Sequence, residues 1–122
     1  MTDSAPRMRH YSAPNNPSVI VAEIVGMVDI HGSTRLLDFM LSLIAQGHWK
    51  LVIDVDRADF VDGAGLDALT GVFNAANRHG GYVVLACSQE LVLRQCRSAG
   101  VTKFFSIWPD SSEAAAFLSS SL

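Results

Sequence analysis

Cysteine is scarce in this sequence. Cys87 and Cys96 are the only two, and they lack the CxxC spacing of a metal or redox site. Both occur in apolar or helical stretches, where a free cysteine behaves as a small buried hydrophobe. We therefore expect two buried free thiols and no disulfide. The chain has 122 residues, of which 49% are hydrophobic, so one compact domain is long enough to bury a core without cross-links.

Positive charge is scarce as well. The chain has 9 Lys and Arg against 12 Asp and Glu, and its basic residues do not cluster with aromatic ones. Nucleic-acid binding needs such a basic surface, so nucleic acid is not an expected partner. No apolar run is long enough to span a membrane, and the first 17 residues lack the apolar stretch of a signal peptide. We therefore expect a cytoplasmic protein that is not inserted in a membrane.

The chain divides into a turn-rich opening, a long patterned region and a short serine-rich end. Residues 1–17 hold three of the four prolines, which predicts a flexible segment with a short edge strand at 8–11. Residues 18–118 are the predicted domain. Residues 119–122 are expected to fray.

Buried-strand and helix patterns alternate through the predicted domain, which indicates an α/β fold. Strands are predicted where apolar and β-branched residues run together, at 19–28, 51–55, 82–86 and 104–108. Gly26 is expected to mark a bulge in the first strand, and 56–59 is predicted to be a polar loop. Helices are predicted to begin at 32–33, 62, 88 and 109–110, each after a capping or turn residue.

Two neighbouring motifs resemble the signature of STAS domains, the family of anti-sigma factor antagonists and sulfate-transporter tails. The buried run Leu51-Val-Ile-Asp-Val55 is followed by Phe60-Val-Asp-Gly-Ala-Gly-Leu66. In the family, a strand ending in Asp precedes Asp-Ser-Ser-Gly-Leu or Asp-Ser-Thr-Gly-Leu at a helix start. Val25-Gly-Met-Val-Asp29 is similar to the family's Gly-x-Leu-Asp strand end, and 99–105 is similar to the segment before its last strand. The resemblance covers about residues 18 to 118.

The resemblance implies a mixed sheet of four to five strands flanked by about four helices. It also implies a protein that docks onto partners, catalyses no reaction and needs no cofactor of its own. In anti-sigma factor antagonists, the partner anti-sigma kinase phosphorylates the last hydroxyl residue of the helix-start turn. Here that position is Ala64 and the preceding one is Gly63, so neither hydroxyl is present. We expect a non-phosphorylatable antagonist, either constitutively active or controlled by other means.

The start of this helix and the end of the first strand are predicted to form the docking site. Asp62 is expected to cap the helix through the amides of Ala64 and Gly65, which serves stability whether or not a partner binds. The residues predicted to contact a partner are Asp29, His31, Ser33, Asp62, Gly63, Ala64, Gly65, Leu66 and Asp67.

Two apolar features each leave two interpretations open. A stripe of small residues at 64, 68, 71 and 75 predicts close packing against the first helix, or a groove for a partner. The first helix has an unusually wide apolar arc because Leu37 and Leu41 flank its main stripe. This arc is expected to be buried under the N-terminal segment, or to form a surface for a partner or for self-association.

Catalytic and metal-binding patterns are weak. His10, His31, His48 and His79 have no ligand spacing, so no metal site is expected. The carboxylates between Asp54 and Asp62 have no nearby nucleophile or His, and they are interpreted as solvent-facing strand ends and caps near one rim. An enzyme is therefore not expected.

Two partner classes follow from the resemblance. The first is an anti-sigma factor of the histidine-kinase-like ATPase type, which would bring any nucleotide itself. The alternative is a membrane transporter complex, with this chain as its STAS accessory subunit. A homodimer is left open.

Overall fold

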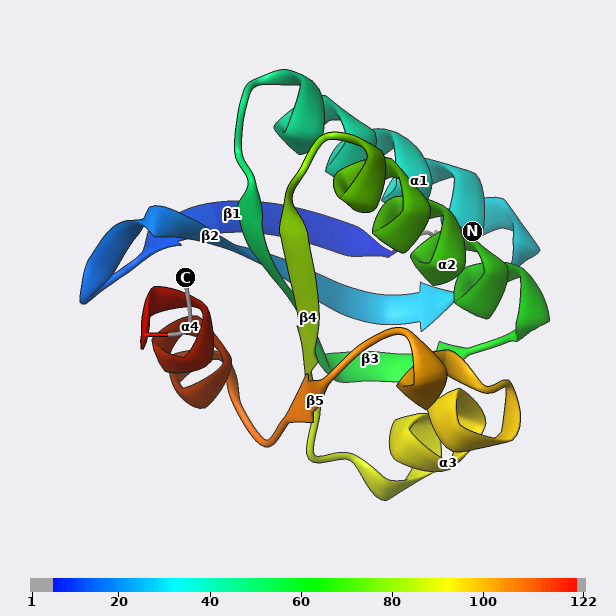
Figure 1. Ribbon diagram of the computed structural model, residues 1–122. Coiled ribbons are helices and arrows are strands. Elements are labelled where there is room, and N and C mark those ends of the chain that lie inside the picture. The colour runs from blue at the N-terminus through cyan, green and yellow to red at the C-terminus, as the bar shows by residue number, and fades with distance from the viewer. Residues whose placement is uncertain (1–5, 121–122) are drawn as a thin grey trace.

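Five strands and four α-helices make up residues 6–120 in the computed structural model, which describes this part of the chain (Figure 1). The elements in chain order are β1 (Arg7–Ala13), β2 (Asn16–Val28), α1 (Ile30–Ala45), β3 (Lys50–Val61), α2 (Gly63–Arg78), β4 (Tyr82–Ala86), α3 (Glu90–Ser98), the 3-10 helix η1 (Val101–Lys103), β5 (Ile107–Trp108) and α4 (Ser111–Ser120). The predicted α/β fold with a mixed sheet is confirmed.

The strands follow one another across the sheet in the order β1-β2-β3-β4-β5. β1 pairs antiparallel with β2, and all later pairs are parallel, which requires a crossover between each pair of strands. The helices α1, α2 and α3 provide these crossovers. The strand predicted over 8–11 is present and longer than predicted, because Arg7 to Ser12 pair residue by residue with Val25 to Ile20.

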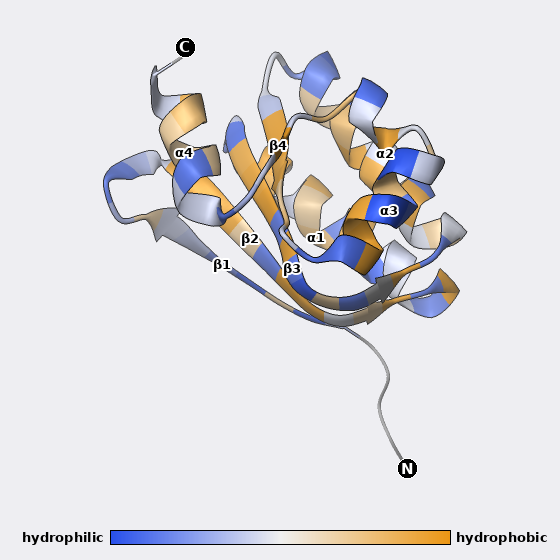
Figure 2. Ribbon diagram, turned by 90° about the horizontal axis from the view of Figure 1, so that it is seen from below, coloured by the Kyte–Doolittle hydropathy of each residue, from blue (hydrophilic) through white to orange (hydrophobic). Residues whose placement is uncertain are grey.

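Two apolar cores lie on opposite faces of the sheet. On β2, Ile20, Ala22 and Ile24 pack toward α1, α2 and α3, whereas Val19 and Val21 pack toward α4. Figure 2 shows the apolar central strands between α4 and the other helices. Successive strand residues point to opposite faces, so burial on both faces explains the uninterrupted apolar run in the sequence.

Both cysteines are buried and free, as predicted. Burial raises the pKa of Cys96 to about 11, so this thiol remains protonated at neutral pH. Neither cysteine contributes to a disulfide, and packing carries the stability of the chain.

The predicted polar loop at 56–59 is wrong, because β3 continues to Val61. Its register with β2 shifts twice, on either side of the Val25–Arg57 and Gly26–Ala58 pairs, and β3 has one extra residue at each shift. The bulge predicted near Gly26 is therefore confirmed, but the extra residues belong to β3. Ala58 and Val61 are buried while Arg57 and Asp59 are exposed, so a polar sequence forms a strand here.

Two helices begin at other residues than predicted, because the side-chain contacts at their starts differ from those expected. The first helix begins at Ile30, because the carboxylate of Asp29 caps it instead of a residue at 32–33. The helix α3 begins after Gln89, and Ser88 does not cap it. The hydroxyl of Ser88 donates instead to the carboxylate of Asp56 on β3, at 2.9 Å.

The last predicted strand is much shorter than expected. Only Ile107 and Trp108 pair with β4, and the 3-10 helix η1 precedes them. Phe105 explains the difference, because its ring turns into the core on the α3 side and contacts Phe73 edge-on. Asp110 caps α4 as predicted, by accepting a 2.8 Å hydrogen bond from the Glu113 amide.

Candidate functional site

Two helix starts with aspartate caps form the predicted site. Asp29 ends the β2 segment, and its carboxylate accepts hydrogen bonds from the amides of His31 and Gly32, both at 2.9 Å. The bond from the Gly32 amide is the main reason that the pKa of Asp29 lies below its ordinary value. Asp62 caps α2 by accepting a 3.0 Å bond from the Gly65 amide. Of the two amides expected to donate to Asp62, that of Gly65 does so and that of Ala64 does not.

The two helix starts are packed against the ends of β2 and β3. A Cβ atom at Gly65 would lie 2.7 Å from the carbonyl oxygen of Val28 and 2.8 Å from Cγ1 of Val61. Both distances are shorter than any ordinary van der Waals contact, so only glycine allows α2 this close to the sheet. At Gly63, by contrast, an added Cβ would meet no atom within 4 Å. The two glycines of the motif therefore have different roles.

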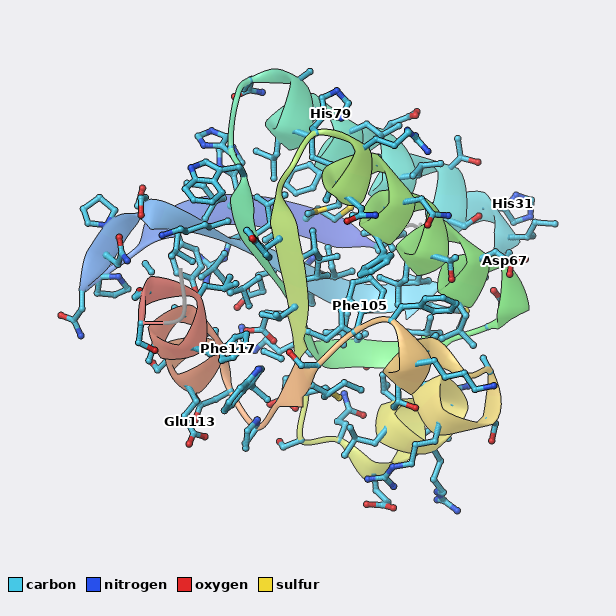
Figure 3. All side chains as sticks on the ribbon, viewed as in Figure 1. His31, Asp67, His79, Phe105, Glu113 and Phe117 are labelled. Atoms are coloured by element: carbon cyan, nitrogen blue, oxygen red, sulfur yellow. The ribbon has the colours of Figure 1, made fainter. Side chains whose placement is uncertain are left out.

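The predicted contact residues separate into surface and buried groups. We call the segments Asp29–Ser33 and Asp62–Asp67 together the docking rim. Figure 3 shows the side chains of His31 and Asp67 at the same end of the helix pair. Only two predicted contact residues, Gly65 and Leu66, are buried, and Leu66 is 8% exposed. Gly65 and Leu66 pack beneath the surface of the rim. The predicted contact residues that are exposed or half-buried are Asp29, His31, Ser33, Asp62, Gly63, Ala64 and Asp67.

Two exposed apolar side chains beside the predicted residues were not anticipated from the sequence. Met27 is 40% exposed and Ile30 is 66% exposed. The sequence pattern placed Met27 in a strand buried on both faces and Ile30 before the start of the helix. Once Asp29 is recognised as the cap, Ile30 becomes the first residue of α1, where no neighbouring turn covers it. Exposed apolar groups surrounded by polar ones are typical of protein-binding surfaces.

The end of β3, which carries Asp62, lacks a strand neighbour on one side. β4 pairs with β3 only as far as Asp54. Side chains of α3 replace the missing strand: Gln95 Oε1 accepts a 3.2 Å bond from the Val61 amide, and Gln89 Nε2 donates to the carbonyls of Asp56 and Ala58. These bonds satisfy backbone groups that would otherwise lose hydrogen-bond partners.

Asp56 attaches the start of α3 to the same strand. Its Oδ1 accepts bonds from the Ser88 amide at 2.7 Å, from the Ser88 hydroxyl and from the Gln89 amide. The bond from the Ser88 amide is the largest cause that lowers the pKa of Asp56 below its ordinary value. Sequence reasoning missed these roles because they depend on contacts between residues more than 30 positions apart.

Asp54 does not face solvent as expected. Desolvation raises its pKa, and the nearby Glu23 carboxylate raises it further. The two residues are partners in the β2–β3 register. Glu23 is itself buried and is paired with Arg9 of β1 at 2.9 Å. Asp54 is therefore a half-buried residue beside Glu23 in the sheet and not part of the rim.

The small-residue stripe of α2 packs against α1. Of the two interpretations of this stripe, close packing against the first helix is therefore the one that the structure shows. A Cβ atom at Gly71 would lie 3.3 Å from Cδ1 of Leu37, and Ala68 and Ala75 are buried. The wide apolar arc of α1 is covered only in part. His10 of β1 lies over Phe39 with ring centroids 5.8 Å apart, while Leu41 remains 37% exposed.

Residues 6–120 hold neither a metal-ligand cluster nor a membrane-spanning helix. No group of three or more His, Cys, Asp or Glu side chains there could hold a metal ion. None of the described helices combines the length and apolar character needed to cross a membrane.

A mixed five-stranded sheet with two capped helix starts at one end defines a STAS-type α/β fold. The STAS domain model matches residues 10–114, which is most of the chain. The chain therefore belongs to the STAS domain family. A sequence search among curated proteins gives no match.

Solved structures of similar fold include anti-sigma factor antagonists. An antagonist from Mycobacterium paratuberculosis has a TM-score of 0.85 at 18% identity, with 97% of each chain covered. The Bacillus cell fate determinant SpoIIAA in its phosphorylated form has a TM-score of 0.67 at 15% identity, covering 90% of this chain and 97% of that one. The murine anion transporter Slc26a9 has a TM-score of 0.65 at 14% identity, covering 97% of this chain and 22% of the transporter. At these identities the likeness concerns the fold alone.

Proposed function

We propose that this chain is an anti-sigma factor antagonist: it binds an anti-sigma factor of the histidine-kinase-like ATPase type and thereby regulates transcription indirectly. The observation that carries this proposal is the docking rim. Its two capped helix starts present Ile30 on α1 and Ala64 on α2, and Ala64 lies within the family signature. Structural likeness to anti-sigma factor antagonists supports it. The exposed and half-buried residues of the rim would make the contacts, without catalysis by this chain.

The absence of a hydroxyl at Ala64 defines the proposed regulation. A phosphate on this helix start would add nearly two negative charges between Asp62 and Asp67. Such charge disfavours an interface by repulsion and by the cost of desolvation. Ala64 cannot carry a phosphate, so binding would not be switched off by phosphorylation at this position.

Two hydroxyls near the rim are already engaged in helix contacts. The Ser33 hydroxyl donates to the Ile30 carbonyl at 2.9 Å, and the Thr70 hydroxyl donates to the Leu66 carbonyl at 3.3 Å. Each bond ties the side chain to its own helix. A third hydroxyl residue, Thr34, is exposed beside the rim. We propose control through the amount of protein, and phosphate on Ser33, Thr34 or Thr70 would contradict this.

The experiment that tests this function is affinity capture of the tagged chain from its native cells, followed by mass identification of bound proteins. The expected partner is a histidine-kinase-like ATPase that also binds a sigma factor. The proposed setting is the cytoplasm, where sigma factors act. Recovery of transporter subunits alone would contradict the proposal.

A second function is favoured by one observation. The likeness to Slc26a9 covers nearly all of this chain but only a fifth of that transporter, so the same fold is a segment of an anion transporter. Under this alternative, the chain would be an accessory subunit of a transporter complex. The missing hydroxyl at Ala64 suits this role equally well, and the same capture experiment separates the two.

A further inference from the structure

A cavity of about 540 Å³ opens at the carboxyl ends of β4 and β5, on the flank of α3. In Figure 1, β5 and α3 lie at the lower end of β4. None of the residues that line the cavity belongs to the docking rim. Cavities between about 300 and 1,000 Å³ have the size of small-molecule sites. In open α/β sheets, ligands bind beyond the carboxyl ends of the strands.

The deep part of this cavity is apolar and uncharged. Phe105 and Cys87 lie there, each only 3% exposed. Burial raises the pKa of the Cys87 thiol, so it carries no charge at neutral pH. Leu93 and Ile107 form half-buried walls, and Trp108 lines the cavity beside Pro109 while its indole stacks on Phe117 with ring centroids 5.0 Å apart. A ligand must therefore present an aliphatic chain or a ring to this part of the cavity.

The mouth of the cavity carries a single charge, the guanidinium of Arg97. Arg97 stands four residues after Leu93 on α3, so both side chains lie on the helix face that borders the cavity. Across residues 6–120, the one ion pair within 4.0 Å joins Arg9 to Glu23, which leaves Arg97 without an acidic partner. The carboxylate of Asp56, which bonds to the cavity residue Ser88, is engaged by Ser88 and Gln89.

We propose that this cavity binds a small amphipathic monocarboxylate, with its carboxylate on Arg97 and its apolar part against Leu93 and Ile107. Arginine binds carboxylates through two parallel charge-assisted hydrogen bonds, which fixes the end of the ligand that stays at the mouth. The hydroxyl of Thr102, exposed at the same cavity, is a further donor. The site is separate from the docking rim and does not depend on the proposed partner.

Trp108 supplies a direct readout of binding. The chain has two tryptophans, so Trp49→Phe leaves Trp108 as the only indole. Octanoate is the probe, titrated into this variant while Trp108 fluorescence is followed. Octylammonium has the same chain and the opposite charge, and it is titrated in parallel. We expect a saturable change with octanoate and no saturable change with octylammonium.

The guanidinium is tested by a matched pair of variants in the same background. Arg97→Gln should weaken octanoate binding by about tenfold, because a charge-assisted hydrogen bond is lost. Arg94→Gln changes an exposed arginine of α3 that does not line the cavity, and it should bind octanoate like the parent. An equal response to both probes, no saturable response to octanoate, or unchanged affinity in Arg97→Gln would overturn the proposal.

Discussion

The main-chain amide of Asp62 donates a 3.1 Å hydrogen bond to the carbonyl oxygen of Val28. This bond joins the last residue of β2 to the residue that caps α2. Val28 directly precedes Asp29, the cap of α1, so one strand end positions both helix starts. The two segments of the docking rim are therefore held by the same strand end, and a substitution that moves this strand end should affect both segments.

Replacing Gly65 tests the tightest of these supports. Gly65→Ala should lower the free energy of unfolding by about 2 kcal/mol, because the added methyl meets the Val28 carbonyl and the Val61 side chain. Gly63→Ala is the matched control, since its methyl would enter open space and alanine favours helix. Urea unfolding of both variants measures the difference. Equal stabilities would show that the close approach at Gly65 imposes no constraint.

Removing the amide of Gln95 tests the attachment of β3 to α3. Gln95→Ala leaves the Val61 amide without its partner, which should cost about 1–3 kcal/mol of unfolding free energy. Gln46→Ala removes an exposed glutamine that bonds only to Ser42 on its own helix, and it should change stability by less than about 0.5 kcal/mol. Chemical denaturation compares the two variants. A loss no larger in Gln95→Ala than in the control would contradict the role assigned to Gln95.

Asp54 and Asp56 should affect the pH dependence of stability in opposite directions. The pKa of Asp54 is raised by desolvation, so the folded state binds its proton more tightly than the unfolded state does. Stability is then reduced at neutral pH and recovers as pH falls through the raised folded pKa toward 3.8. Asp54→Asn, which keeps the oxygen that accepts the Asp56 amide, should increase stability at pH 7 and remove this recovery.

The pKa of Asp56 is lowered by the Ser88 amide, so its contribution has the other sign. Stability from Asp56 is fully present above 3.8, the unfolded value, and is lost as pH falls through the lower folded pKa. Asp56→Asn should destabilise the protein at pH 7, and its difference from the parent should shrink below pH 3.8. Thermal unfolding across this pH range measures both variants. Parallel profiles for the parent and the two variants would contradict both assignments.

Much of the fold could be predicted from local patterns. Strand β4 and the start of α2 depend on an apolar run and an aspartate cap close in sequence, and they were found where expected. The second half of β3 could not be predicted, because residues 56–59 have the polar composition of a loop. They form a strand only through pairing with β2 and hydrogen bonds from Gln89. The last strand was predicted at 104–108 and is limited to Ile107 and Trp108, because Phe105 is buried in the core instead of pairing in the sheet.

The candidate site was predictable where a backbone motif defines it. The cap Asp62 follows from residue type and position, as does the absence of a hydroxyl at Ala64, whereas the cap of α1 was expected at 32–33 and is Asp29. The exposure of Ile30 could not be predicted, because it depends on the exact residue at which α1 begins. The engagement of Gln95 with Val61 joins positions 34 apart, and no local pattern indicates it.

Restoring a hydroxyl tests the proposed loss of regulation. In Ala64→Ser, the hydroxyl occupies the position that the family resemblance assigns to phosphorylation. Incubation with the partner kinase and ATP should place one phosphate on Ala64→Ser and none on the parent helix start. Intact-mass and peptide measurements detect the difference. Phosphate on residues 62–70 of the parent would contradict the account.

The central claim, that the start of α2 binds an anti-sigma factor, is tested most directly by calorimetric titration of the captured partner with Ala64→Asp. Ala116→Asp is the matched control, because Ala116 is exposed on α4, which covers the opposite face of the sheet from α2. We predict that Ala64→Asp weakens binding at least about tenfold through charge repulsion and desolvation, while Ala116→Asp binds like the parent and both unfold like it. Unchanged affinity in Ala64→Asp would place the interface elsewhere on the molecule and contradict the account.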